Sequence, residues 1–387
     1  MSAGCNSRLI RPPATVYADG GGRAIGASVG EREARYSSVL VSFFPSLIPL
    51  HPGDAVNFSV RDSGEPHTVA LGRLVDSALT ALDTVATTAG VRTIEALPQM
   101  RALPSVFPGS VDTDRPRVNG SAAERCFLDT GAPPVSATGG APECREEEQP
   151  DFEGTQSFYS SGFLKEGEPF RVKLSDRIRP GIYGFMCLVH RASMTGAIEV
   201  RAATVERPPV ADVREQAQNE EDEAASTLGP VARRALTRSE DGVLAGTGPG
   251  GRARGFLASF IPERTRIRAG GTVTWALFGM HSISFEPERD AREGVLVEDG
   301  EGVRLNLDAW RPVRSRPPPA AALSFPPTLA NVDVDGGSWS GEGSFSSGIL
   351  RATPPASVKY SLRFTEPGTY RYFCLVHPPM RGTVEVG

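Results

Sequence analysis

The stretch Y370-R-Y-F-C-L-V-H-P-P-M380 places a cysteine, a histidine and a methionine within seven residues of one another. A closely similar stretch, Y183-G-F-M-C-L-V-H-R-A-S-M194, occurs in the first half of the chain. One such string is compatible with a buried cysteine, a surface histidine and a core methionine. Two copies in one chain favour a ligand role that both copies share.

The two stretches belong to a longer internal repeat. Each copy is preceded by a similar hydrophobic segment and a histidine, and each is followed by the pattern M-x-G-x-[IV]-E-V. The matching pairs are G53-D-A-V-N-F-S-V60 with G270-G-T-V-T-W-A-L277, S157-F-Y-S-S-G-F-L164 with S344-F-S-S-G-I-L350, and M194-T-G-A-I-E-V200 with M380-R-G-T-V-E-V386. The sequence therefore predicts a tandem duplication.

The repeated segments have the pattern of β-strands. Apolar residues alternate with polar ones over 56–60, 170–174, 273–277 and 360–364, and proline–glycine pairs separate the segments. The chain holds 33 prolines and 42 glycines, which argues against a helical bundle. We expect an all-β protein in which each unit is an antiparallel sandwich or barrel.

The regions between the repeated segments set the expected domain boundaries. We predict an N-terminal tether over 1–35, a first domain over 36–202, a linker over 203–254 and a second domain over 255–387. An insertion over about 71–150 should begin with a helix, because Leu71, Leu74, Val75, Leu79, Leu82 and Val85 share one helical face. An insertion over about 286–340 should hold a hairpin around an Asp-Gly pair, and the linker a helix near 215–225.

The repeated motif combines donors that suit copper. Thiolate and thioether sulfurs are soft ligands for Cu(I), whereas imidazole suits both oxidation states. The chain has only five histidines, and four of them fall on matched positions of the repeat. The two methionines favour copper over zinc.

Both units resemble cupredoxins, the blue-copper family that includes plastocyanin and amicyanin. The resemblance rests on G53-D-A-V-N-F with P66-H-T68 and on P180-G-I-Y-G-F-M-C-L-V-H190 in the first unit. In the second unit it rests on G270-G-T-V-T-W with M280-H-S282 and on P367-G-T-Y-R-Y-F-C-L-V-H377. It implies two Greek-key β-barrels, each holding one type 1 copper ion. By motif, the implied ligands are His67, Cys187, His190 and Met194 in one site, and His281, Cys374, His377 and Met380 in the other.

The resemblance also implies roles around the ligands. Thr68 and Ser282 match the position whose side chain braces the cysteine loop. His190 and His377 match the histidine that reaches the surface, so redox partner proteins are expected to dock there on an apolar patch, formed by Leu188, Val189, Leu375, Val376, Pro378 and Pro379. His51 aligns with Arg268 in the second unit and is expected to be a surface residue.

An electron carrier with two one-electron sites is the function that this pattern favours. Multicopper oxidases and copper nitrite reductases also contain tandem cupredoxin domains, but their additional copper is held mainly by histidine and only His51 remains. A copper storage or delivery protein is the alternative from a different class. The mild net charge of −5, with arginines interspersed among acids, does not favour nucleic-acid binding. No apolar run is long enough to span a bilayer.

The remaining cysteines favour a location outside the cytoplasm. Cys126 and Cys144 both lie in the first insertion and are predicted to form a disulfide. Cys5 in M1-S-A-G-C5 resembles the end of a bacterial lipobox, although the apolar region expected before it is absent, and lipidation is weighed against a free cysteine. We therefore expect a periplasmic or cell-surface protein, with a lipid anchor at Cys5 as one option.

Overall fold

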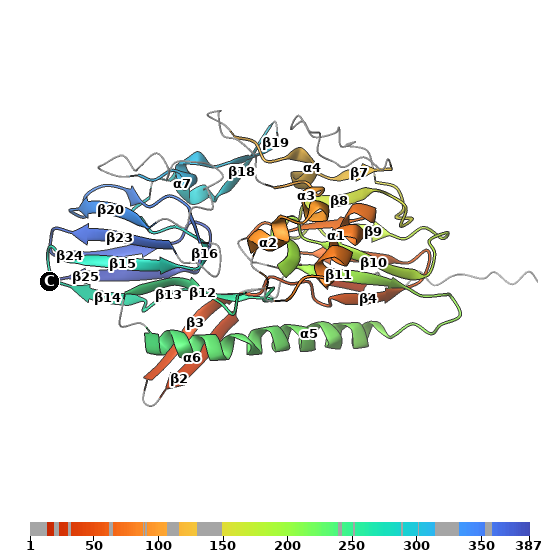
Figure 1. Cartoon of the computed structure of the whole chain (residues 1–387), viewed down its shortest axis with the longest axis horizontal. Helices are drawn as coiled ribbons and strands as arrows, with labels where there is room; N and C mark the ends of the chain where they lie inside the picture. The colour runs from red at the N-terminus through yellow and green to blue at the C-terminus, as the bar shows by residue number, and fades with distance from the viewer. Residues whose placement is uncertain are drawn as a thin grey trace, which may run out of the picture.

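The chain forms two β-rich units that lie side by side in the computed structural model (Figure 1). The structure describes residues 14–18, 23–29, 32–61, 65–87, 89, 91–106, 116–129, 149–238, 242–250, 252–287, 289–300, 302–313, 333–352 and 358–387. Within these ranges the fold is mostly β, with several open sheets. No helix in these ranges is both long and apolar enough to cross a membrane.

The first unit packs two sheets against each other. The larger sheet has the order β4-β11-β10-β6-β8-β7, and the smaller has the order β1-β5-β9. Their bounds are β1 Ala14–Tyr17, β4 Leu47–Leu50, β5 Ala55–Ser59, β6 Thr68–Leu71, β7 Cys126–Leu128, β8 Phe158–Phe163, β9 Phe170–Lys173, β10 Gly181–Met186 and β11 Thr195–Val200. An aromatic cluster of Phe43, Phe58 and Phe185 fills the space between the two sheets.

The second unit repeats this plan with additional strands. Its sheets have the orders β2-β3-β13-β12-β15-β23-β20 and β14-β25-β24-β17-β21. The bounds are β12 Val243–Thr247, β13 Phe256–Ile261, β14 Arg264–Ile267, β15 Thr272–Leu277, β17 Ser284–Phe285, β20 Val334–Trp339, β21 Phe345–Ser346, β23 Val358–Phe364, β24 Gly368–Phe373 and β25 Arg381–Val386. A further pair joins β16 (Gly279–His281) to β22 (Leu350–Ala352).

Three strands in each unit are paired in the same way. In the first unit β1 runs parallel to β5, and β5 pairs antiparallel with β9. In the second unit β12 runs parallel to β15, and β15 pairs antiparallel with β23. Because β12 occupies the place of β1, the second unit begins near residue 243. The last part of the segment expected as a linker is therefore a strand of the second unit.

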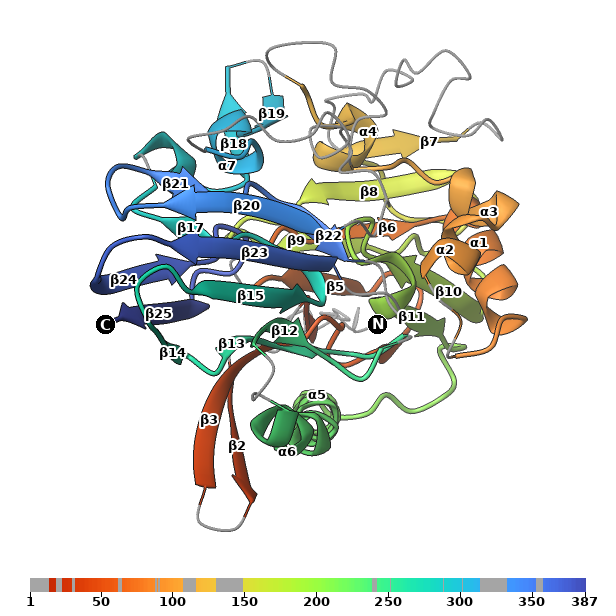
Figure 2. The ribbon, with the colours of Figure 1, turned by 60° about the vertical axis from the view of Figure 1, so that its left-hand side comes forward.

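The N-terminal segment joins both units. Strands β2 (Arg23–Val29) and β3 (Arg32–Val39) form a hairpin, and β3 pairs with β13 of the second unit through Val39–Phe256 and Ser38–Leu257. Figure 2 shows this hairpin projecting from the body of the molecule. Part of the expected tether is thus sheet structure, and the boundary drawn at residue 35 falls inside β3.

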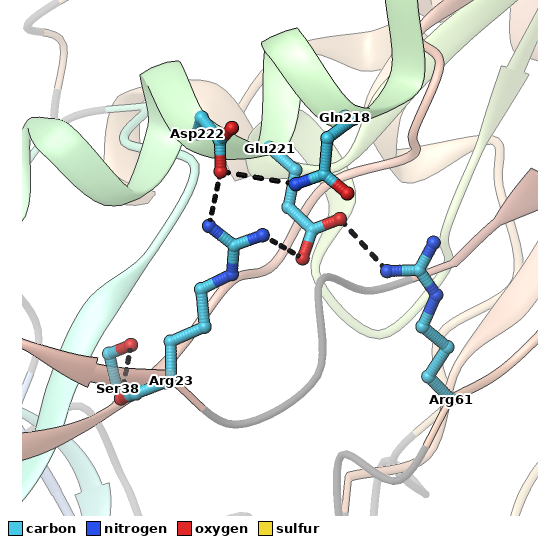
Figure 3. A network of polar contacts seen from close by, with 6 residues as sticks. All are labelled: Arg23, Ser38, Arg61, Gln218, Glu221 and Asp222. Atoms are coloured by element: carbon cyan, nitrogen blue, oxygen red, sulfur yellow. Dashed lines mark hydrogen bonds and ion pairs between the residues drawn. The ribbon is translucent and has the colours of Figure 1, made fainter. Parts of the chain in front are cut away.

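Two helices of the linker run along both units. The predicted linker helix is confirmed as α5 (Val210–Ser226), and α6 (Leu228–Arg238) follows it. Glu221 of α5 is buried and binds Arg23 at 2.7 Å and Arg61 at 2.8 Å, while the exposed Asp222 binds Arg23 at 2.6 Å (Figure 3). These ion pairs hold α5 against the N-terminal hairpin and the end of the β5 segment.

The two insertions lie against each other. The helix predicted at the start of the first is confirmed as α1 (Arg73–Asp83), followed by α2 (Val91–Glu95), α3 (Pro98–Arg101) and α4 (Gly120–Ala123). The hairpin predicted in the second is confirmed as β18 (Leu296–Asp299) and β19 (Gly302–Leu305), which precede α7 (Leu307–Trp310). Arg117 binds Asp299 at 3.1 Å, and the Val118 amide donates to the Val303 carbonyl at 3.0 Å. These contacts fix the two units relative to each other.

Candidate metal centres

The first cluster joins three side chains from the ends of two neighbouring inner strands, β6 and β10, of the larger sheet of the first unit. His67 immediately precedes β6, whereas Cys187 and His190 follow β10, and β6 pairs with β10. One ligand atom from each residue lies within 4.8 Å of the others. Cys187 Sγ is 3.7 Å from His190 Nδ1, and the rings of His67 and His190 are 4.9 Å apart. His67 and Cys187 are fully buried.

The second cluster has the same composition and origin. His281 ends β16, and Cys374 and His377 follow β24. The donor atoms form a triangle, with Cys374 Sγ 3.8 Å from His281 Nδ1 and 3.6 Å from His377 Nδ1, and 3.1 Å between the two nitrogens. All three side chains are buried. Among the residues that the structure describes, these two clusters are the groups of three or more close Cys, His, Asp or Glu side chains suited to a metal.

The triangle of the second cluster has the size that a metal ion requires. A point at its centre lies about 2.0 Å from all three donor atoms, close to the typical bond lengths of a transition metal to thiolate and imidazole. One thiolate and two imidazoles in a trigonal arrangement form the equatorial ligand set typical of blue-copper sites. The residues therefore fit copper.

The predicted methionines are buried at the ends of the ligand loops. Met194 and Met380 have no exposed surface, and the amide of each ligand cysteine donates to the carbonyl of the methionine in its loop at 3.0 Å. This bond closes each loop and brings the start of the next strand, β11 or β25, beside the cysteine. The extra residue of the first loop is accommodated by a 3-10 turn, η1 (Arg191–Ser193).

Thr68 and Ser282 lie directly beside the cysteine loops. The Thr68 hydroxyl accepts from the Leu188 amide at 2.7 Å, and the Ser282 hydroxyl accepts from the Leu375 amide at 2.8 Å. Their own amides point at the ligand sulfurs, each with N–Sγ 3.4 Å. An amide aimed at a thiolate stabilises its negative charge, and the hydroxyl fixes the backbone that carries the cysteine.

The ring nitrogens that face away from the clusters are also engaged. His281 Nε2 donates to the Phe278 carbonyl at 2.7 Å. His190 Nε2 lies 3.1 Å from Glu65 Oε2, and His377 Nε2 lies 2.5 Å from Glu65 Oε1. Metal-binding histidines commonly donate their second N–H to a carbonyl or carboxylate, which leaves the other nitrogen for the metal. The arrangement leaves Nδ1 of these three histidines directed at the clusters.

The charges within the clusters stabilise ionised cysteines. Burial raises the pKa of Cys187 and Cys374, but the neighbouring imidazoles outweigh it and hold the pKa of each thiol well below its usual value. Burial lowers the pKa of His190 and His377, yet their cysteine and Glu65 partners raise it to about 10. Burial likewise raises the pKa of Glu65, and its two histidine partners bring it well below the usual range. Thiolates are the form that binds metals.

The first insertion holds the first ligand loop in place. Arg191 follows His190 in a left-handed conformation with φ of 46°, which is uncommon for a residue other than glycine. Its guanidinium donates to the Met100 carbonyl at 2.5 Å and lies 2.8 Å from the Glu95 carboxylate. Helices α2 and α3 therefore contact the ligand loop, a role that sequence reasoning did not assign to the insertion.

The residues of the expected docking patches differ in their exposure. His377 is only 2% exposed, and Leu188, Leu375 and Val376 are buried as well. Of the predicted patch residues, Pro378 and Pro379 are exposed. The outer nitrogens of His190 and His377 meet at Glu65, between the two units, and the His190 side chain is still 18% exposed.

The remaining histidine was expected at the surface but is buried. His51 is 5% exposed, and its Nδ1 accepts from the Arg207 guanidinium at 2.7 Å. Arg207 also binds Asp54 at 2.6 Å. His51 thus takes part in a structural contact between the first unit and the linker and belongs to neither cluster.

The cysteines outside the clusters are described only in part. Cys126 is disulfide-bonded, whereas Cys187 and Cys374 are free thiols. Cys144, its predicted partner, and Cys5, the predicted lipidation site, lie outside the described residues. The pairing of Cys126 with Cys144 stays a prediction.

Comparison with known proteins gives only partial likeness. No protein-family model matches the chain, and no curated protein matches its sequence. Among solved structures, a mutant of amicyanin in its reduced Cu(I) form is 22% identical over 32% of this chain and 70% of its own, with a TM-score of 0.17. Another reduced amicyanin mutant is 17% identical over 40% of this chain and 89% of its own, with a TM-score of 0.20. Such TM-scores leave the whole architecture unmatched, so we base the assignment of a metal on the side chains of the clusters.

Proposed function

We propose that the protein is an electron carrier with two type 1 copper sites, one in each of two tandem cupredoxin-like units. The observation that carries the proposal is the repeated cluster of one buried thiol and two imidazoles, each followed by a buried methionine. Copper bound there would supply a one-electron Cu(I)/Cu(II) couple. The ligands would be His67, Cys187, His190 and Met194, and His281, Cys374, His377 and Met380.

The protein side of this function is to hold the donors still. Hydroxyl groups of Thr68 and Ser282 fix the cysteine loops, and hydrogen bonds donated by Nε2 fix three imidazole rings. Burial of both thiols excludes water from the donor atoms. Because the ligands cannot rearrange freely, little of the protein has to move when the charge at the site changes, which favours rapid electron exchange.

Copper stoichiometry combined with visible absorption tests the proposal. The wild-type chain should bind two copper ions and show the intense absorption of a copper–thiolate bond. C187A and C374A should each retain one ion and about half of the absorption, whereas H51A, at the histidine outside the clusters, should retain both ions. Binding of two ions without a thiolate band, or loss of both ions from either cysteine variant, contradicts the assignment.

A copper storage or delivery protein is the second candidate function. Buried donors that release their metal slowly also suit storage. Reversible oxidation and reduction of the purified protein would support the carrier, whereas tight Cu(I) binding without reversible electrochemistry would support storage. An oxidase or nitrite reductase would additionally turn over oxygen, phenols or nitrite, and we expect no such turnover.

We further propose that the protein works outside the cytoplasm, in the periplasm or at the cell surface. Support comes from the disulfide at Cys126, since disulfides persist mainly in oxidising compartments. Fractionation of the native host, with mass spectrometry of the N-terminal peptide, would show whether Cys5 carries a lipid. Recovery of the protein with Cys126 reduced in the cytoplasmic fraction would refute this location.

A further inference from the structure

One carboxylate lies between the two clusters and contacts both. Glu65 Oε2 is 3.1 Å from His190 Nε2, and Glu65 Oε1 is 2.5 Å from His377 Nε2. The Glu65 side chain is 8% exposed, and those of His190 and His377 are 18% and 2% exposed. A buried carboxylate therefore accepts a hydrogen bond from one candidate ligand of each unit, and we call this arrangement the Glu65 bridge.

The internal repeat shows that the bridge exists only once. Glu65 stands two residues before His67, and the position two residues before His281 is Gly279. The second unit therefore has no acidic side chain of its own at this place. The hairpin and insertion contacts that fix the two units bring His377 to the carboxylate of the first unit, 312 positions away in the sequence.

The energetics of the bridge favour a functional role over a purely structural one. A buried charge is costly even when it is paired, and apolar residues of similar volume often stabilise an interface equally well. The carboxylate is compensated here by charge-assisted hydrogen bonds from two imidazoles. Groups that bind the outer nitrogen of a metal-binding histidine orient the ring and tune the metal. Glu65 is placed to do so for both clusters together.

We propose that Glu65 couples the two metal sites, so that the charge at one site changes the reduction potential of the other. This inference rests on the proposed function, because it requires a redox metal in each cluster. A positive charge gained at one cluster strengthens the hydrogen bond from its histidine to Glu65 and weakens the bond from the other histidine. Oxidation of one site therefore makes oxidation of the other less favourable, and the coupling is reciprocal.

The geometry also gives the direction of single-residue effects. Removing the negative charge of Glu65 favours the reduced form at both sites, so both potentials should rise. The effect should be larger at the second site, where the bond to Glu65 is shorter and the histidine is less exposed. In the wild type each imidazole contacts a different oxygen of Glu65, and in E65Q one of these oxygens becomes an NH2 group, which cannot accept a hydrogen bond from Nε2–H. The bridge is therefore broken even though the side chain keeps its size.

Redox titration of the copper-loaded full chain tests the proposal. Potentials are measured in the wild type, in E65Q, and in E166Q, which removes an exposed carboxylate elsewhere on the first unit. We expect E65Q to shift the reduction equilibrium of the second site at least about tenfold, or about 59 mV for one electron. E166Q should leave both potentials nearly unchanged.

The reciprocal part of the proposal is tested without altering Glu65. In C187S the first site lacks its thiolate. The potential of the second site in this variant should differ from the potential of the second site in the wild type when the first site is oxidised. The same comparison made with C374S measures the influence of the second site on the first, which should have the same sign and lie within the 5- to 150-fold range typical of coupled sites. When the same two cysteine substitutions are made in E65Q, the coupling factor between the sites should fall toward one.

The outcomes separate this inference from the proposed function. Two copper ions that titrate reversibly, with potentials unaffected by E65Q and by the state of the other site, would overturn the coupling and leave the carrier function intact. Failure of the wild type to bind redox-active copper would overturn both. If E65Q does not fold, E65D provides the test, because the shorter carboxylate keeps the charge but cannot reach both imidazoles. The C187S and C374S comparison remains decisive in either case.

Discussion

Replacing Gly246 by alanine is expected to disrupt the second metal site and leave the first intact. Gly246 lies in β12 with φ of 71°, and an added Cβ would be 2.3 Å from His281 Nε2 and 3.0 Å from the Phe278 carbonyl oxygen. These are the two partners of the hydrogen bond that orients the His281 ring. The added methyl group therefore displaces a candidate ligand directly.

The magnitude follows from two contributions. A left-handed backbone costs roughly 1–2 kcal/mol for a residue with a Cβ. Loss of the bond from His281 to Phe278 adds about 0.5–1.5 kcal/mol. We therefore expect G246A to lower the free energy of unfolding by about 1.5–3.5 kcal/mol in urea titrations of the metal-free protein. Disturbing a group that orients a metal-binding histidine typically weakens metal affinity about 10- to 100-fold, here at the second site alone.

Gly250 supplies the matched control. It follows the same strand with φ of 79°, and an added Cβ would meet no atom within 4 Å. G250A should show the backbone cost alone and bind two metal ions with unchanged affinity. Binding of two ions by G246A with wild-type affinity and spectrum would refute this effect on His281. Loss of metal by G246A from the first site rather than the second would refute it as well.

The other predictions concern the cysteine loop, the linker helix and proton release. S282A leaves the buried Leu375 amide without its acceptor and should lower the free energy of unfolding by about 1–3 kcal/mol. S282T keeps the hydroxyl and should lower it by less, so equal losses in the two variants would contradict the assigned hydrogen bond. E221Q removes the charge shared by Arg23 and Arg61 and should cost about 1–3 kcal/mol in chemical unfolding. D222N, at an exposed partner of Arg23, should cost less, and the reverse order would refute the role of the buried carboxylate. In the metal-free clusters each thiolate lies beside an imidazole, His190 or His377, whose pKa is about 10. At pH 9 this imidazole is mostly protonated, so metal binding should release about one proton per site. Calorimetry in buffers of different ionisation enthalpy measures the number of protons released. Thiols and imidazoles with their ordinary pKa values of 9.0 and 6.5 would release only about half a proton per site.

The composition of the clusters was predictable because the repeat marks it twice. Cysteine and histidine share one short loop in each unit, and pairing of β6 with β10, or of β17 with β24, brings the upstream histidine to that loop. Period-two alternation likewise identified β5, β9, β15 and β23. These features depend on contacts within one unit, and such contacts leave a periodic signal in the sequence.

The contacts between units left no comparable signal. Glu65 is a single acidic residue next to a proline, and nothing local shows that His377 will lie against it. The sequence of β3 (Arg32–Val39) does not indicate which strand it pairs with, and its partner β13 lies more than 200 positions away. The burial of His377 follows from the same packing. The sequence marks this packing only by a difference between the two units, which have Glu65 and Gly279 at matching positions.

The pairing of β3 with β13 also constrains biosynthesis. Ser37 and Ser259, which share hydrogen bonds across this pairing, are 222 positions apart, so at typical elongation rates the ribosome needs roughly 10–40 s to deliver the second strand after the first. Throughout that interval β3 presents an unpaired strand edge, the kind of surface that recruits other chains. The nascent chain therefore exposes this edge of its amino-terminal hairpin until translation is well advanced.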